Sequence, residues 1–201
     1  MKYPTSVTLN LPEWLNQLLS GKALRLPDPE ARMRWVIELS RLNVENASGG
    51  PFAAAVFERE TGRLLGAGVN RVEPLNLSPA HAEIVAIAFA QEMTKTFDLN
   101  SFGAGSELLT SSQPCLMCLG AVLWSGVTRL TYGAAVADVT GTLGFDEGPL
   151  PRDWPGELNK RGITVVGEYL RAEAAAVLDL YRQGQGTVYN GRRGRAERGK
   201  P

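Results

Sequence analysis

Stretches with the patterns of strands and helices alternate from about residue 51 to residue 183, and this order restricts the possible folds more than any other feature of the chain. Residues 52–70 predict a β-hairpin with Thr61 and Gly62 in its turn. Further strands are predicted at 107–111, 128–135 and 162–167, and helices at 80–95, 115–126, 156–161 and 168–183. Because alternating strands and helices form layers, we expect an α/β domain with helices on both faces of its sheet, and a parallel crossover between the last two strands.

The length of 201 residues suits one domain with terminal extensions. Helices predicted at 12–20 and 28–46 form an N-terminal extension over 1–47, which we expect to pack on the core. The main domain spans 48–190, with predicted loops at 72–79 and 137–156. The polar, basic and glycine-rich segment 191–201 is typical of a flexible tail.

The charge balance argues against a protein that grips nucleic acid through a basic surface. Lysine and arginine number 21, aspartate and glutamate also number 21, and the formal net charge is zero. The N-terminal residues lack the apolar core of a signal peptide, and no apolar run reaches the roughly 18 residues that cross a bilayer. Two cysteines three positions apart do not suggest a secreted disulfide framework. We therefore expect a cytoplasmic protein without membrane partners, and we expect no nucleic-acid partner.

Three metal-binding side chains and one carboxylate stand at the starts of two predicted helices. His81, the single histidine, comes two residues before Glu83, and the only cysteines, Cys115 and Cys118, lie about one helical turn apart. One imidazole and two thiolates are suitable zinc ligands, and a fourth position left open for water is typical of catalytic zinc. Glu83 would then be near enough to take a proton from that water.

Each of these features also has a simpler interpretation. A single histidine is more often a packed core residue, and a CxxC pair alone can be a redox dithiol or part of a structural zinc domain. The combination is more specific, because HAE at 81–83 and PCLMC at 114–118 match the H-x-E…P-C-x-x-C signature of zinc nucleobase deaminases. A structural site would need neither the glutamate nor the open position, so the combination favours a zinc enzyme.

The chain resembles the cytidine-deaminase-like superfamily, and within it the bacterial guanine deaminases of that fold. The resemblance runs from about residue 49 to 150 and is carried by GGPFAAAVF at 49–57, GVNRV at 68–72, AHAE at 80–83, PCLMCLGAVLWSG at 114–126 and GFDEG at 144–148. It implies a three-layer α/β/α fold with a five-stranded mixed sheet, one zinc ion per chain and a homodimer. The implied activity is hydrolysis of a free nucleobase, guanine to xanthine and ammonia.

The resemblance also implies roles for single residues. His81, Cys115 and Cys118 would bind zinc, Glu83 would shuttle protons, and Glu147 would be a second catalytic acid. Contacts to the substrate would come from Phe52, Asn70, Ala82, Trp124, Phe145 and Asp146. Core packing is the alternative for Phe52 and Trp124, and a turn conformation is the alternative for Asn70.

One departure from the family, the role of the C-terminal segment and two other substrate classes stay open at this point. Gln113 stands where the family commonly has a glutamate before Pro-Cys, which removes a charge beside the metal. In relatives the C-terminal segment can cover the chain's own site or the partner's, and Tyr181, Tyr189 and Asn190 are the candidates here. The alternative activities are deamination of tRNA adenosine, with the basic tail as an RNA contact, and deamination of another small ring such as cytosine or a triazine.

Overall fold

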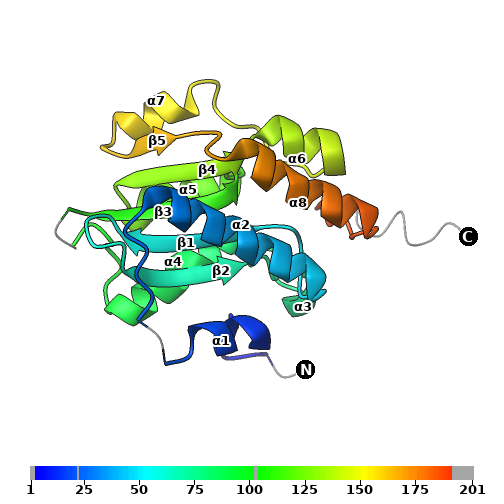
Figure 1. Cartoon of the computed structure of the whole chain (residues 1–201), viewed down its shortest axis with the longest axis horizontal. Helices are drawn as coiled ribbons and strands as arrows, with labels where there is room; N and C mark the ends of the chain where they lie inside the picture. Colours follow the sequence, from blue (N-terminus) through cyan, green and yellow to red (C-terminus); the bar gives the residue numbers. More distant parts are fainter. Residues whose placement is uncertain (1–2, 22, 102–103, 192–201) are drawn as a thin grey trace, which may run out of the picture.

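The computed structural model describes residues 3–21, 23–101 and 104–191, so the predicted basic tail lies outside the described residues except for Gly191. Five strands form one sheet in the order β2-β1-β3-β4-β5 (Figure 1). The strands are β1 (Ala53–Glu58), β2 (Leu64–Val69), β3 (Ser106–Ser112), β4 (Arg129–Ala134) and β5 (Thr164–Val166). β1 is antiparallel to β2 and β3, whereas β3, β4 and β5 are parallel. The predicted five-stranded mixed sheet is confirmed.

Helices cover both faces of this sheet, as predicted. On one face, α4 (Ala82–Thr94) and α5 (Leu116–Ser125) pack against alternate strand residues such as Leu108. On the other face, α2 (Pro29–Glu45) and α8 (Arg171–Gln183) cover the residues between them, such as Leu109. This alternation is the two-residue period of a strand that is buried on both sides. Figure 1 shows α2 and α8 in front of the sheet and α4 behind it.

The N-terminal helices are present close to where the sequence predicts them. α1 spans Glu13–Leu19, and α2 begins after Asp28, whose carboxylate accepts hydrogen bonds from the backbone N–H groups of Glu30 and Ala31. Because α2 contributes Met33, Val36 and Leu39 to the core, it forms part of a layer of the domain. The boundary at residue 47 stays a prediction. No helix in the described part of the chain has both the length and the apolar character that a bilayer crossing requires.

Both predicted loops contain helices, so the loop assignments at 72–79 and 137–156 are wrong in part. α3 spans Val72–Leu75, α6 spans Val136–Leu143, and α7 spans Trp154–Asn159, two residues earlier than predicted. α6 depends on a distant partner, because Arg171 at the start of α8 binds both carboxylate oxygens of Asp138 at 2.8 and 2.9 Å. The same carboxylate accepts the Ala135 N–H at 2.8 Å and so caps the helix. The threonine and glycine residues of α6 are weak helix formers, and the local sequence does not show that Asp138 is held by a residue 33 positions away.

Candidate active site

The three predicted metal ligands meet where the N-termini of α4 and α5 converge on one face of the sheet. His81 is the N-cap of α4 and Cys115 is the N-cap of α5, with Cys118 in the first turn that follows. α4 can approach the sheet closely because β2 carries glycine at the contact. A Cβ atom at Gly68 would lie 2.5 Å from both the carbonyl oxygen of Ala82 and the nitrogen of Ala86. The spacing between strand and helix therefore fixes the position of His81.

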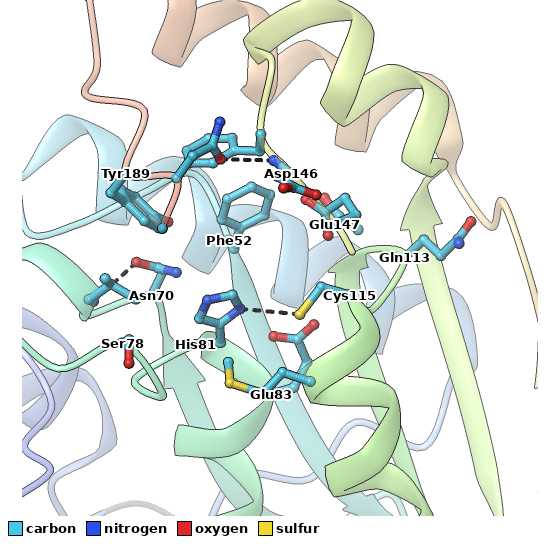
Figure 2. A pocket seen from close by; sticks show the side chains of 16 residues that line it. Phe52, Asn70, Ser78, His81, Glu83, Gln113, Cys115, Asp146, Glu147 and Tyr189 are labelled. Atoms are coloured by element: carbon cyan, nitrogen blue, oxygen red, sulfur yellow. Dashed lines mark hydrogen bonds between the residues drawn. The ribbon is translucent and has the colours of Figure 1, made fainter. Parts of the chain in front are cut away.

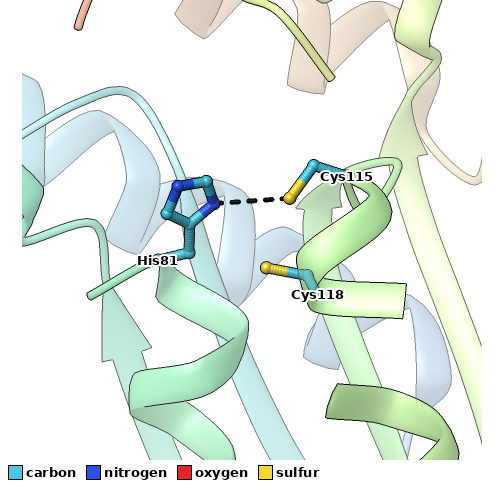
Figure 3. A group of neighbouring side chains, drawn as sticks. All are labelled: His81, Cys115 and Cys118. Atoms are coloured by element: carbon cyan, nitrogen blue, oxygen red, sulfur yellow. Dashed lines mark hydrogen bonds between the residues drawn. The ribbon is translucent and has the colours of Figure 1, made fainter. Parts of the chain in front are cut away.

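The candidate ligand atoms of His81, Cys115 and Cys118 all lie within 4.8 Å of one another (Figure 3). The Nδ1 atom of His81 faces the sulfur of Cys115 at 3.6 Å. Hydrogen bonding from Cys118 and contact with His81 lower the pKa of the Cys115 thiol to about 4, whereas hydrogen bonding with Cys115 and burial raise the pKa of Cys118. One nitrogen and two sulfurs, with one thiol readily ionised, are the donor set that Zn²⁺ prefers. The residues present therefore fit a zinc ion.

Glu83 is the second residue of α4, two positions after His81, and it is not one of the three clustered metal ligands. Its side chain is buried, and burial, followed by the negative charge of Cys115, raises its pKa to about 7. A carboxyl group with a pKa near neutrality can both accept and donate a proton at physiological pH. This is the protonation behaviour expected of a proton shuttle.

His81, Cys115 and Glu83 line a cavity of about 240 Å³ (Figure 2). Five of the other predicted site residues line it: Phe52, Asn70, Phe145, Asp146 and Glu147. The ring of Phe145 contacts Phe52 edge-on at 5.4 Å between centroids, and it contacts Tyr189 at 4.8 Å. Three segments that are far apart in the sequence thus build one aromatic wall, which suits a flat ring.

Glu147 reaches the cavity from the loop after α6, and that loop is held at three backbone atoms. The carbonyl oxygen of Glu147 accepts the N–H of Leu116, at the start of α5, at 3.0 Å. Asn190 holds the preceding residues, since its Nδ2 donates to the Gly144 carbonyl at 2.9 Å and its Oδ1 accepts the Asp146 N–H at 2.8 Å. Burial, with the charges of Cys115 and Glu83, raises the pKa of Glu147 to about 8.

The C-terminal segment covers the site of its own chain. Tyr189, Asn190 and Gly191 all line the cavity, and the Tyr189 hydroxyl lies so close to Gly50 that a Cβ there would be 2.4 Å away. Tyr181 does not line the cavity; it is buried, and its hydroxyl donates to the Thr187 carbonyl at 2.8 Å. Of the three candidates for a cover, two are therefore at the site and one positions the turn before it.

Trp124 and Ala82 do not line the cavity, so their predicted substrate contacts are not found within the chain. Trp124 is 86% exposed on the outer side of α5, so the alternative of core burial is wrong. The inner side of α5 is occupied by Cys118, Leu119 and Val122, which leaves Trp124 on the opposite side of the helix. Ala82 is the first residue of α4 and is fully buried.

Four further residues of the cavity were not assigned roles from the sequence. They are Val72, Ser78, Ser112 and Met117, and nothing in their local sequence distinguishes them from packing residues. Gln113 also lines the cavity, and its Oε1 accepts the N–H of Val136 at 3.4 Å, so it contacts the start of α6. A neutral amide can make this contact without placing a charge beside the metal ligands.

The sequence profile described as the cytidine and deoxycytidylate deaminase zinc-binding region matches residues 27–134. The chain belongs to this family. The guanine deaminase of Bacillus subtilis is 32% identical over 118 residues, which cover 59% of this chain and 71% of that protein. The tRNA-specific adenosine deaminase of Buchnera aphidicola is 31% identical over 149 residues, which cover 74% of this chain and 90% of that protein.

Solved structures show a closer likeness. The guanine deaminase of Nitrosomonas europaea is 47% identical, with a TM-score of 0.84 over 91% of this chain and 100% of that one. The Nitrosomonas protein bound to 2,6-diaminopurine is 49% identical, with a TM-score of 0.85 over 92% of this chain and 97% of that one. The family and the donor set agree on a zinc-binding deaminase whose metal ligands are His81, Cys115 and Cys118.

Proposed function

We propose that this protein is a zinc-dependent guanine deaminase that hydrolyses guanine to xanthine and ammonia. The observation that carries the proposal is the buried Glu83, which lies beside the three metal ligands and faces a small cavity with an aromatic wall. The likeness to the Nitrosomonas and Bacillus guanine deaminases supports guanine as the substrate. Zinc in this site would supply a Lewis acid that lowers the pKa of water toward neutrality.

Two carboxyl groups of the chain carry out the proton transfers. Glu83 holds a proton near the metal ligands and passes it to the ring, because its pKa of about 7 allows both states. Glu147, with a pKa raised to about 8 by burial, can donate a hydrogen bond or a proton to the group that leaves as ammonia. Both carboxyl groups face one cavity, so proton uptake and release can occur on a single bound ring.

Phe52, Phe145 and Asn70 orient the ring. The two phenyl rings meet edge-on and form an apolar wall, while Asn70 is 1% exposed and its backbone is fixed at both ends. Its carbonyl oxygen accepts from Asn43, and its N–H donates to the Phe52 carbonyl at 2.9 Å. The Oδ1 of Asn70 also accepts the Val72 N–H, so the amide is held in one orientation before a substrate binds.

The size of the cavity favours a free base over a nucleotide in RNA. At about 240 Å³ it lies below the roughly 300–1000 Å³ of pockets that hold drug-sized ligands. Asn190 lines this cavity and is hydrogen-bonded to the 144–146 loop, so the C-terminal segment and that loop together form part of the cavity wall. These features favour guanine, or another small aminated ring, over tRNA adenosine.

The substrate is tested by measuring ammonia release by the zinc-loaded protein from guanine, cytosine, adenine and a tRNA anticodon stem-loop in parallel. We expect release from guanine with kcat/KM at least about a hundredfold above the other bases, since unmatched polar groups in a buried site discriminate strongly. Preferred turnover of cytosine or of the RNA would contradict the guanine assignment while leaving the deaminase chemistry in place.

We also propose that the protein is a cytoplasmic homodimer that associates through the outer face of α5. This helix contains no charged residue, yet only one side of it is covered by the sheet. Its uncovered side carries Leu116, Met117, Leu123 and Trp124, and Phe97, 82% exposed, lies on the loop whose Leu99 N–H donates to the Ser125 carbonyl. A helix that is apolar all round is normally buried, and the same face on two copies is self-complementary.

Sedimentation velocity tests this surface. Trp124→Glu should give a monomer at concentrations at which the unmodified protein is a dimer, whereas Tyr3→Glu, at a residue 80% exposed elsewhere, should not change the mass. A dimer that persists in Trp124→Glu would contradict the assignment of this face.

A further inference from the structure

Two buried hydroxyl groups at the cavity have no hydrogen-bond partner within the described residues. Four buried side-chain nitrogen or oxygen atoms of this part of the chain lack a hydrogen-bond partner, and the only hydroxyls among them are those of Ser112 and Tyr189. Both residues line the cavity. Because a buried polar group without a partner costs free energy, such groups point to a ligand that supplies the missing hydrogen bond.

Ser112 has no structural reason to be polar. It is the last residue of β3 and is 4% exposed, and its register partner on β4 is Ala134. The neighbouring Ser111 differs, since its Oγ accepts the N–H of Ala53 at 3.1 Å and so joins β3 to β1. An alanine at 112 would preserve the packing and remove the unsatisfied hydroxyl, so the hydroxyl is not explained by the fold.

The strand register places Ser112 in one row with two substrate residues. The N–H of Asn70 donates to the carbonyl of Phe52, which makes these residues cross-strand neighbours. β1 pairs with β3 so that Ala54 lies opposite Thr110, and continuing this antiparallel register by two residues sets Phe52 opposite Ser112. The row therefore runs Asn70, Phe52, Ser112, with the phenylalanine in the middle.

The three side chains of this row point to the same face of the sheet. Cross-strand neighbours share a face, and residues an odd number of positions away on the same strand point to the opposite face. Val69 and Leu109 belong to the core on the α2 and α8 side, so Asn70 and Ser112 point to the α4 and α5 side, where His81 and Cys115 lie. With strands about 4.8 Å apart, the two ends of the row are separated by about 10 Å, which spans a fused two-ring heterocycle.

We propose that the Ser112 hydroxyl is a specificity-determining group that hydrogen-bonds an in-plane polar atom of the purine, on the opposite side from Asn70. This inference rests on the proposed function and extends it to a residue whose sequence context gave no signal. The ring would lie against Phe52, held by the Asn70 amide at one edge and by the Ser112 hydroxyl at the other. A hydroxyl can donate or accept, so the atom it meets is identified by removing polar atoms from the ligand one at a time.

The test measures dissociation constants by calorimetry in the zinc-loaded Glu83→Gln background, where turnover does not interfere. The ligands are 8-azaguanine, 2-aminopurine, which lacks the oxygen at position 6, and 7-deazaguanine, which lacks the ring nitrogen at position 7. We expect Ser112→Ala to weaken 8-azaguanine binding roughly three- to tenfold, the effect of one neutral hydrogen bond. For the analogue that lacks the partner atom, the same substitution should change affinity less than about twofold.

Thermal denaturation and a matched serine separate this role from a structural one. Ser112→Ala should leave Tm unchanged or raise it, because it removes an unsatisfied buried hydroxyl. Ser111→Ala should lower Tm, because it deletes the hydrogen bond to Ala53, and it should leave the relative affinities of the three ligands unchanged. An equal loss of affinity for all three ligands in Ser112→Ala, or no loss, overturns the proposal for Ser112 alone. A zinc-replete protein that binds none of the three rings overturns the proposed function together with it.

Discussion

The Nδ1 atom of His81 lies 3.6 Å from the sulfur of Cys115, although the two residues are 34 positions apart and belong to different helices. The contact exists because α4 and α5 begin at the same end of the strands, beyond the carboxyl ends of β2 and β3, and pack on the same face of the sheet. A metal ion held between their N-termini therefore links two elements of the fold. This linkage makes zinc a contributor to stability as well as to catalysis.

Removal of zinc should lower the thermal stability of the protein. Binding to the native state alone stabilises it by an amount that grows with the metal concentration relative to the dissociation constant. We expect chelation to reduce Tm by several degrees, and we expect Cys118→Ser to have a lower Tm that chelation does not change further. Differential scanning calorimetry with metal analysis checks this, and an equal Tm for holo and chelated protein would count against a metal held between the two helices.

Gly68→Ala should displace α4 and weaken the metal site. The added methyl group would meet backbone atoms of Ala82 and Ala86 at 2.5 Å, and backbone cannot move aside as a flexible side chain can. We expect a loss of about 2–3 kcal/mol in unfolding free energy, typical of overpacking, together with weaker zinc binding. Gly141→Ala is the control, because a Cβ there meets nothing within 4 Å, and its stability should be unchanged or slightly higher. Equal stabilities of the two variants would contradict the close approach of α4 to β2.

Asn190→Ala should lower activity more than it lowers stability. The side chain holds the backbone at Gly144 and Asp146, and Glu147 follows directly. Loss of both hydrogen bonds should reduce kcat/KM by about tenfold or more, since small displacements of catalytic groups are costly. The exposed Asn159, replaced by alanine in the same way, should retain full activity. Steady-state kinetics and Tm are measured on both variants. A lower Tm for Asn190→Ala with an unchanged kcat/KM would contradict the positioning role.

Asp138 should contribute stability that depends on pH. Hydrogen bonding from Arg171 lowers the pKa of Asp138, so its contribution is fully present above the pKa of the unfolded chain and is lost as pH falls through the lower folded value. Asp138→Asn should therefore cost about 1 kcal/mol at pH 7, and the difference from the unmodified protein should shrink in acid. Asp179→Asn, in an exposed pair with Arg182, should cost less. Urea unfolding between pH 3 and pH 7 measures the difference, which should not grow toward low pH.

The sequence identified the parts of the site that depend on local patterns and one known combination of residues. His81, Glu83, Cys115 and Cys118 could be found because each stands at a helix start and their spacing is specific. α6 could not be predicted, because Asp138 is held by Arg171 from a distant helix. Trp124 was misplaced because an apolar helix does not reveal which of its sides faces the sheet.

The role of Ser112 lay beyond sequence reasoning for a different reason. Whether a buried hydroxyl lacks a partner is a property of the packed structure and has no local pattern. Asn190 is a similar case, since its two hydrogen bonds span 44 and 46 residues. Such contacts become visible only when the chain is folded.

The most direct test of the central claim is the release of ammonia and xanthine from guanine by zinc-loaded protein, compared with Glu83→Gln of equal zinc content. Glutamine preserves the shape of the side chain but cannot carry a proton between water and the ring. We expect turnover by the unmodified protein, and we expect Glu83→Gln to bind guanine but to lower kcat by at least about a hundredfold. A Glu83→Gln protein that turns over guanine at the normal rate would contradict the role of Glu83 at the centre of this mechanism.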